Sequence, residues 1–191
     1  LFADMVSSTL NNIEETFSNI DEDTLQRAGE MIWNCDDVYV LGVGVNNSCI
    51  NNFAYLARTC MVQFHAIPRP GSTPIDDLAW SNQDDVLIAI TCRPYRSEVV
   101  QAVKVAKDQG MRIIAISDSP ASPIIRMADI GFTVSVETPQ FFPSSVATIA
   151  LLETLLSFVI ANASDRVVER AETFQKRRHE LGIYEEGSDE R

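Results

Sequence analysis

Short apolar, β-branched runs alternate with helical patterns along most of this chain, and that alternation constrains the fold more than any other feature. The five runs are Val38–Val43, Met61–Ile67, Val86–Thr91, Arg112–Ser117 and Gly131–Val136. Near-continuous apolar strands separated by helices are typical of a parallel sheet that is covered on both faces. The sequence therefore predicts an α/β fold, a three-layer sandwich around a five-stranded parallel sheet.

The segments between and after these runs have helical periodicity. Helices are expected over Ser48–Arg58, over Ser97–Gln109 with Gly110 at its C-terminal cap, over Ser144–Ile160 and over Ser164–Leu181. The last helix is amphipathic, whereas the one before it is apolar enough to be a buried covering helix. These helices supply the two outer layers of the sandwich.

Two further helices are expected before the first strand. Apolar residues recur at three- and four-residue steps from Phe2 to Ile20, and Leu25–Trp33 forms the second helix. The first stripe has little of its own chain to cover, so we expect a homodimer to bury it. The expected organisation is linker and dimerisation helices at 1–34, a ligand-binding domain at 35–184 and a frayed tail at 185–191.

Composition argues against several classes of protein. The chain has 191 residues and a formal net charge of -12, which disfavours binding of a nucleic-acid backbone by this chain alone. Its apolar runs are too short for a membrane span. The irregularly spaced cysteines fit the reduced thiols of a cytoplasmic protein, and two histidines far apart in the sequence argue against a metal site.

The polar segments after the strands form the candidate site, because ligands of open parallel sheets bind at the carboxyl ends of the strands. Each segment leads into a helix start, whose unpaired N–H groups suit a phosphate or a carboxylate. The candidate ligand-binding residues are Gly44, Asn46, Asn47, Ser48, Thr91, Arg93, Tyr95, Arg96, Ser97, Ser117, Ser119, Ser144 and Ser145. For single serines such as Ser48, ordinary helix capping is the alternative. The Gly42–Gly44 pair lacks the third glycine of a dinucleotide-binding fingerprint, so no cofactor is expected.

Arg93 and Arg96 lie where the third strand gives way to a helix. A cation at a helix N-terminus opposes the helix dipole by roughly 0.3–1 kcal/mol, so this placement needs a reason. One interpretation is that the arginines bind an anionic ligand, with Tyr95 as a wall for a ring or sugar face. The other is that they pair with Glu98, Asp118 or a carboxylate of a partner chain.

The segments Ile113–Pro123 with Arg126–Asp129, Phe141–Glu153 and Arg177–Tyr184 resemble the sugar isomerase (SIS) domain, and specifically the effector domain of RpiR/MurR-family transcriptional regulators. The resemblance implies a flavodoxin-like strand order of 2-1-3-4-5 and a phosphosugar-sensing domain that forms a dimer or tetramer. It also implies that DNA binding belongs to a preceding helix-turn-helix domain, and that Leu1 falls in the linking helix.

The loop after the third strand departs from the family pattern S-x-S-G-x-T-x-E. Arg93, Pro94 and Arg96 replace the second serine, the glycine and the threonine, as in an arginine- and tyrosine-bearing subgroup of these regulators. The serine of the family's first loop falls on Asn46. An anionic effector is still expected, either a phosphosugar or a sugar acid.

Three function classes remain open. The first is an effector-sensing domain of a bacterial transcriptional regulator, which binds its ligand without turnover. The second is a sugar-phosphate aldose–ketose isomerase, which would need a base such as Glu98, Glu137, Glu153 or His65. The third is a ligand-free dimerisation scaffold. The resemblance favours the first, with no catalytic residue assigned and Cys92 interpreted as a buried thiol.

Overall fold

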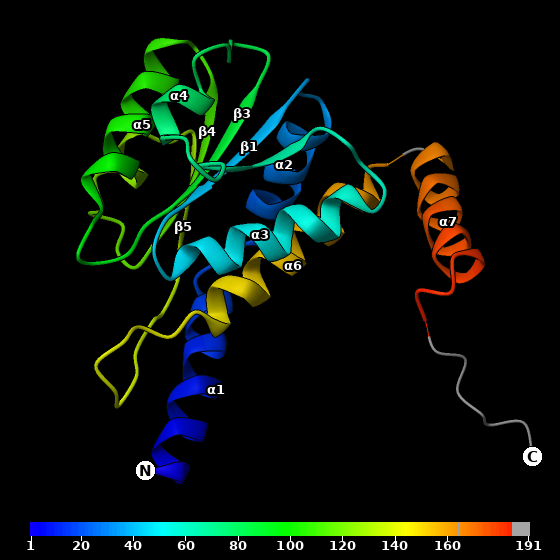
Figure 1. Ribbon diagram of the computed structural model, residues 1–191. Coiled ribbons are helices and arrows are strands. Elements are labelled where there is room, and N and C mark those ends of the chain that lie inside the picture. The colour runs from blue at the N-terminus through cyan, green and yellow to red at the C-terminus, as the bar shows by residue number, and fades with distance from the viewer. Residues whose placement is uncertain (164, 185–191) are drawn as a thin grey trace, which may run out of the picture.

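Five parallel strands form one sheet in the order β2-β1-β3-β4-β5 (Figure 1). This computed structural model describes residues 1–163 and 165–184, so the tail at 185–191 and Ser164, the expected start of the last helix, lie outside the described residues. The strands are β1 Val38–Gly42, β2 Phe64–Ile67, β3 Val86–Ile90, β4 Arg112–Ser117 and β5 Ile130–Thr133. Both the predicted fold class and the predicted strand order are confirmed.

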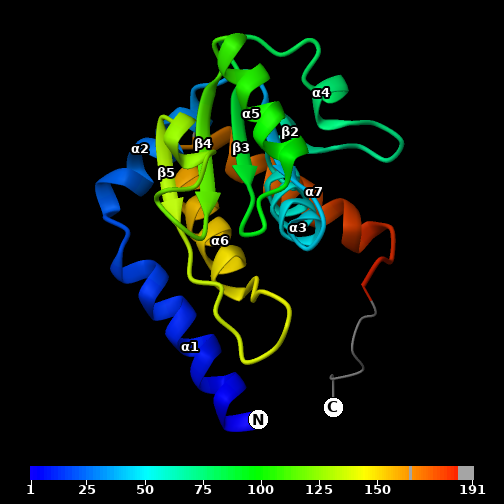
Figure 2. The ribbon, with the colours of Figure 1, turned by 90° about the vertical axis from the view of Figure 1, so that its left-hand side faces the viewer.

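Helices cover both faces of the sheet, as Figure 2 shows from a second direction. The helices are α1 Phe2–Ser18, α2 Glu22–Trp33, α3 Asn46–Arg58, α4 Pro74–Asp77, α5 Ser97–Asp108, α6 Val146–Ala161 and α7 Asp165–Glu180, with a short 3-10 turn at Ile125–Met127. Helices α2, α3 and α6 pack on one face, and α4 and α5 lie on the other. None of the helices in the described part of the chain is long and apolar enough to cross a membrane.

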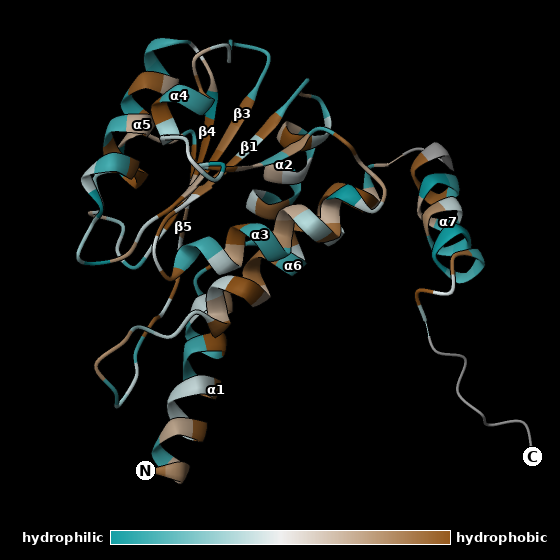
Figure 3. Cartoon of the chain, viewed as in Figure 1, coloured by the Kyte–Doolittle hydropathy of each residue, from teal (hydrophilic) through white to brown (hydrophobic). Residues whose placement is uncertain are grey.

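Hydrophobic residues concentrate on the strands and on the inner sides of the helices (Figure 3). All five residues of β3 are fully buried, because this strand lies in the middle of the sheet and is covered from both sides. Gly110 follows α5 with a φ of 82°, the left-handed conformation expected after a helix end.

Two strands are shorter than the sequence pattern predicts, and each difference has a local cause. β2 begins at Phe64 rather than Met61, because the Met61 backbone N–H still bonds to the carbonyl of Ala57 at the end of α3. β5 ends at Thr133 rather than Val136, because the backbone beyond it is hydrogen-bonded by side chains of α1.

Helix α1 packs against α6, and its two buried residues, Asn12 and Thr16, lie in its second half. Its first half projects from the body in Figure 1, and three large apolar side chains are exposed there, Phe2 at 85%, Val6 at 43% and Leu10 at 62%. An exposed apolar helix face is a feature that an association partner would cover. Burial of this face in a homodimer stays a prediction.

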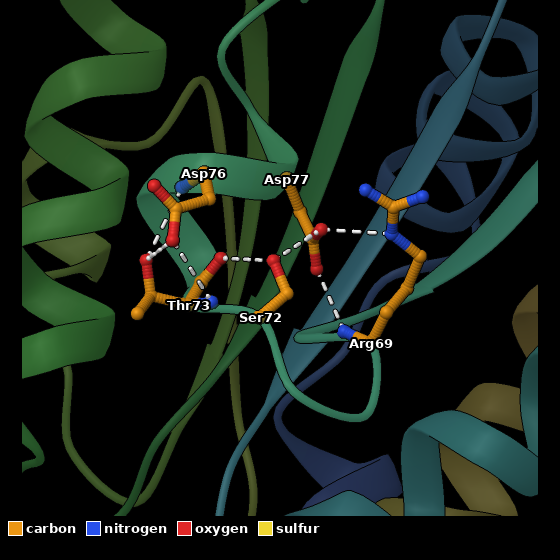
Figure 4. Close-up of polar contacts among 5 residues, drawn as sticks. All are labelled: Arg69, Ser72, Thr73, Asp76 and Asp77. Carbon is orange, nitrogen blue, oxygen red and sulfur yellow. Dashed lines mark hydrogen bonds and ion pairs between the residues drawn. The ribbon is translucent and has the colours of Figure 1, made fainter.

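A polar cluster fixes the loop that follows β2 (Figure 4). The Asp77 carboxylate accepts hydrogen bonds from the backbone N–H of Arg69 at 2.7 Å, from Arg69 Nε at 2.8 Å and from Ser72 Oγ at 2.7 Å. Thr73 caps α4 by accepting from the Asp76 backbone, and the Asp76 carboxylate accepts in return from Thr73. The reciprocal bonds indicate a structural role for this cluster.

Candidate functional site

A cavity of about 280 Å³ lies at the carboxyl ends of β1 and β3, where the strand order reverses. Seven of the predicted ligand-binding residues line it, namely Gly44, Asn46, Thr91, Arg93, Arg96, Ser144 and Ser145. The rest of its wall consists of Val43, Val45, Cys92, Pro94, Val136, Pro143 and Thr148. Segments after β1, β3 and β5 thus meet at one hollow.

The other six predicted residues lie outside the wall of this cavity. Ser117 is fully buried behind it and donates a hydrogen bond from Oγ to the carbonyl of Thr91 at 2.6 Å, which supports a residue that lines the cavity. Ser48 donates to the Val45 carbonyl, and Ser119 accepts from the backbone of Ala121. Asn47, Tyr95 and Ser97 complete this group of six.

Three helices begin at the cavity, and none of them is capped by the side chain of its preceding residue. Those residues are Val45 before α3, Arg96 before α5 and Ser145 before α6. By contrast, Asp21 and Thr73, which do not line the cavity, cap α2 and α4 with their side chains. At α6 the Val146 N–H donates to Ser144 Oγ at 3.5 Å. The partial positive charge of the three helix starts suits an anion in the cavity.

Each arginine of the cavity wall is paired with a carboxylate that was predicted as a possible partner, Asp118 or Glu98. Arg93 Nε donates to Asp118 Oδ2 at 2.7 Å, and Arg96 Nη2 donates to Glu98 Oε1 at 2.6 Å. Both side chains are nevertheless more than half exposed, at 67% for Arg93 and 56% for Arg96. The carboxylates therefore orient the guanidinium groups and leave N–H donors at the rim of the cavity.

The electrostatics of the Arg93–Asp118 pair favour its charged form. Partial burial acts to raise the pKa of Asp118, but hydrogen bonds from the Arg93 side chain and from backbone N–H groups, together with the charge of Arg93, outweigh it. The pKa of Asp118 consequently lies below its ordinary value. Hydrogen bonding to Asp118 likewise raises the pKa of Arg93.

The cavity wall of the described chain has no carboxylate and no imidazole. Of the isomerase candidates, Glu98 pairs with Arg96. His65 bonds to Asp37 at 2.7 Å, and Asp37 directly precedes β1 at its amino end, whereas the cavity lies at its carboxyl end. Glu137 and Glu153 are not in the wall either. Burial and the charge of Asp118 raise the pKa of the Cys92 thiol to about 12, which argues against a nucleophilic role. Within the described residues no group of three potential ligands could hold a metal ion.

Sequence reasoning missed several residues of the wall, of which Thr148 is the most polar. Its side chain is 1% exposed, and it follows Ser144 by four residues and Ser145 by three. Residues at these spacings share one face of a helix, so the spacing could have identified Thr148. Val136 carries no such local signal, since it reaches the cavity only through the path of the chain after β5.

The family comparison agrees with this architecture. The family model for the SIS domain matches residues 31–158. The chain belongs to the SIS domain family. It is 28% identical over 171 residues to an uncharacterised HTH-type transcriptional regulator of Clostridium perfringens, covering 87% of this chain and 61% of that protein. It is 27% identical to the HTH-type transcriptional regulator RpiR of Escherichia coli K12, covering 88% of this chain and 57% of that protein. This chain therefore spans about three fifths of the length of these relatives.

Solved structures with this fold include a domain of a transcription factor and an isomerase. The sugar isomerase domain of the RpiR transcription factor from Sphaerobacter thermophilus superposes with a TM-score of 0.85 at 23% identity, covering 95% of this chain and 99% of that one. The Vibrio vulnificus NanR protein complexed with ManNAc-6P gives 0.80 at 16% identity, covering 94% and 69%. Phosphoheptose isomerase GmhA from Neisseria gonorrhoeae gives 0.69 at 19% identity, covering 84% and 97%. These likenesses establish the fold.

Proposed function

We propose that this SIS domain is the effector-sensing domain of a bacterial transcriptional regulator and that its cavity binds an anionic sugar derivative, a phosphosugar or a sugar acid. The observation that carries the proposal is the convergence of three helix starts and two arginines on one cavity without an acidic wall residue. In a chain of net charge -12, a cavity wall that has two arginines and no acidic residue is a specific feature. The relatives named as HTH-type regulators support the regulatory role.

The wall has the donors that a sugar acid or phosphosugar needs. Arg93 and Arg96 provide planar guanidinium groups for the charged end of the ligand, and Ser144, Ser145 and Thr91 add hydroxyl groups. A volume of about 280 Å³ suits one monosaccharide unit better than a larger ligand. The phosphosugar in the complex of the NanR neighbour, ManNAc-6P, belongs to this ligand class.

In the proposed regulator, DNA binding belongs to a helix-turn-helix domain on the N-terminal side of α1, and the SIS domain forms the homodimer or tetramer. Ligand binding shifts the population between two arrangements of the subunits, and it can do so only if the ligand binds one of them more tightly. Such a regulator works in the cytoplasm, which agrees with four free cysteines in the chain.

Thermal unfolding against a panel of ligands tests the proposal. The panel contains glucose 6-phosphate, N-acetylmannosamine 6-phosphate and gluconate, with glucose and N-acetylmannosamine as neutral controls. A ligand at about one hundred times its Kd adds roughly 2.7 kcal/mol to the free energy of unfolding, which raises the midpoint measurably. We expect at least one anion to raise it and the neutral sugars to leave it unchanged.

Variants of the cavity wall make the test specific. Arg93→Ala and Arg96→Ala are expected to lose the anion response, whereas Arg126→Ala, which removes an exposed arginine outside the cavity, retains it. A panel without any response would contradict ligand sensing and support the dimerisation scaffold. Conversion of a bound aldose phosphate to a ketose, followed by NMR, would instead support the isomerase.

A further inference from the structure

The segment between β5 and α6 has two different neighbours. Val136, Pro143, Ser144 and Ser145 line the ligand cavity. The residues on either side of Val136, Ser135 and Glu137, are instead bonded to α1. Both ribbon views show this segment leaving β5 beside α1 before it loops back to α6 (Figures 1 and 2). One short stretch of backbone therefore contacts both the cavity and the N-terminal helix.

Asn12 makes the central contact with this segment. Its Oδ1 accepts from the Glu137 backbone N–H at 3.1 Å and from Ser135 Oγ at 2.9 Å, and its Nδ2 donates to the Glu137 carbonyl at 2.6 Å. Thr16 Oγ1 accepts from the Ser135 backbone N–H at 2.9 Å. Asn12 and Thr16 are each 1% exposed, so these bonds are shielded from water.

The far side of the same segment is tied to the cavity wall. The carbonyl of Val136 accepts from the Ser144 backbone N–H at 3.0 Å, which closes the loop from 136 to 144. A smaller hollow of about 140 Å³ is lined by Arg93 and Asp118 together with Glu15 and Thr16 of α1. Arg93 thus lies between the ligand cavity and α1. A shift of α1 would therefore move two parts of the cavity wall, Val136 and Arg93.

We propose that Asn12 is a positioning residue that couples α1 to the ligand cavity through Val136. The assignment of the cavity as an anion site rests on the proposed function. The link between α1 and the cavity wall rests only on the contacts of α1 with Ser135 and Glu137, of which Asn12 makes three, whereas Thr16 and Ser8 make one each. Buried amide pairing of this kind specifies one placement, because rotation of α1 would leave polar groups without partners. Coupling is reciprocal, so a ligand that reorders the wall changes the docking of α1 by the same free energy.

Hydrogen–deuterium exchange of the whole chain tests the link without any ligand. In Asn12→Ala, amides of residues 138–145, which Asn12 does not touch, are expected to exchange faster than in the wild type, by about fivefold at the Ser144 amide, whose N–H donates to the Val136 carbonyl. Asn11→Ala is the matched control, since Asn11 is the exposed neighbour on the same helix, and it should leave these amides unchanged. Equal exchange of residues 138–145 in the wild type and Asn12→Ala would overturn the proposal.

A second arm adds inorganic phosphate or N-acetylmannosamine 6-phosphate. In the wild type, either probe should slow exchange both in residues 138–145 and in α1. In Asn12→Ala, either probe should still slow exchange in residues 138–145 but should leave exchange in α1 unchanged. An α1 response that persists in Asn12→Ala overturns the coupling. Should both probes leave the wild type unchanged, the proposed ligand class is contradicted, and the ligand-free comparison still decides the link.

Ser135→Ala is a second variant that tests the same link if Asn12→Ala does not fold. It removes one hydroxyl partner of Asn12 and leaves both backbone bonds to Glu137 in place. If Asn12→Ala also exchanges its β3 amides rapidly, the variant is globally unfolded and Ser135→Ala provides the comparison. In Ser135→Ala we expect residues 138–145 to exchange faster than in the wild type, by a smaller factor than in Asn12→Ala. Exchange of these residues at the wild-type rate in Ser135→Ala would overturn the proposal.

Discussion

Arg93 holds Asp118 with both its side chain and its backbone. Nε of Arg93 donates to Oδ2 of Asp118 at 2.7 Å, and the Arg93 backbone N–H donates to Oδ1 at 3.3 Å. The Asp118 side chain is only 9% exposed, whereas that of Arg93 is 67% exposed. The carboxylate is thus an anchor that joins the loop after β3 to the end of β4 and presents the guanidinium at the rim of the cavity.

Asp118→Asn should lower the free energy of unfolding by about 1.5–3 kcal/mol, because hydrogen bonds to a charged group are lost or weakened. Since the pKa of Asp118 is lowered in the folded state, its contribution is fully present above its ordinary pKa of 3.8 and is lost as the pH falls further. Urea unfolding at several pH values measures both effects. Asp108→Asn, at an exposed position, is the control, and equal acid sensitivity of the wild type and Asp118→Asn would contradict the assignment.

Glu98→Gln should strengthen binding of the anionic ligand. Glu98 accepts from two nitrogens of Arg96, at 2.6 and 3.1 Å, and its charge opposes an anion in the cavity. For a pair this exposed the effect is modest, about a two- to fivefold lower Kd. Isothermal titration with the best anion of the panel measures it, and Arg96→Ala should change Kd in the opposite direction. Weaker binding in Glu98→Gln would mean that Glu98 itself contacts the ligand.

The sheet and much of the cavity could be predicted because their signals are local. Each strand is an apolar run, and the polar residues that end β1 and β3 follow directly from the run before them. The two carboxylate partners of Arg93 and Arg96 were likewise among the alternatives. The anchoring of α1 could not be predicted, since Asn12 and its partner Ser135 are 123 residues apart and no spacing rule joins them. The position of Val136 in the cavity wall could not be predicted either, because it depends on the path of the chain after β5 and not on a local pattern.

Gly42→Ala should destabilise the fold more than Gly44→Ala. A Cβ at Gly42 would lie 2.9 Å from the Asn46 carbonyl oxygen and 2.8 Å from Ile50 Cγ2, so the start of α3 must move away from β1. At Gly44 nothing lies closer than 3.9 Å, and the cost is the strain of its φ of 61°, about 1–2 kcal/mol. Chemical denaturation ranks the two variants. A smaller loss for Gly42→Ala would show that α3 adjusts freely.

Cys92 should resist alkylation although it lines the cavity. Its pKa of about 12, against an ordinary value of 9.0, lowers the thiolate fraction near neutral pH by about a thousandfold. Iodoacetamide labelling followed by peptide mass spectrometry tests this, with the chain unfolded in guanidinium chloride as the control for intrinsic reactivity. Rapid native labelling of Cys92 would reopen a nucleophilic role. Cys35, with a pKa raised by burial to about 11, should also react slowly.

Asp77→Asn should destabilise the loop after β2 without weakening anion binding. The Asp77 side chain is 1% exposed and accepts three hydrogen bonds from Arg69 and Ser72 (Figure 4). None of these three residues lines the cavity. Burial acts to raise the pKa of Asp77, but these hydrogen bonds and the charge of Arg69 outweigh it, so the pKa is lowered. The stability from Asp77 is therefore complete above pH 3.8 and is lost on further acidification.

The expected loss for Asp77→Asn is about 1.5–3 kcal/mol in the free energy of unfolding, because an amide cannot accept all the bonds that a buried carboxylate does. Urea unfolding gives the loss, and titration with the best anion of the panel gives Kd. An unchanged Kd in Asp77→Asn, beside a raised Kd in Arg96→Ala, separates the structural cluster at the sheet edge from the cavity between β1 and β3. A raised Kd in both variants would mean that the loop after β2 also shapes the ligand site.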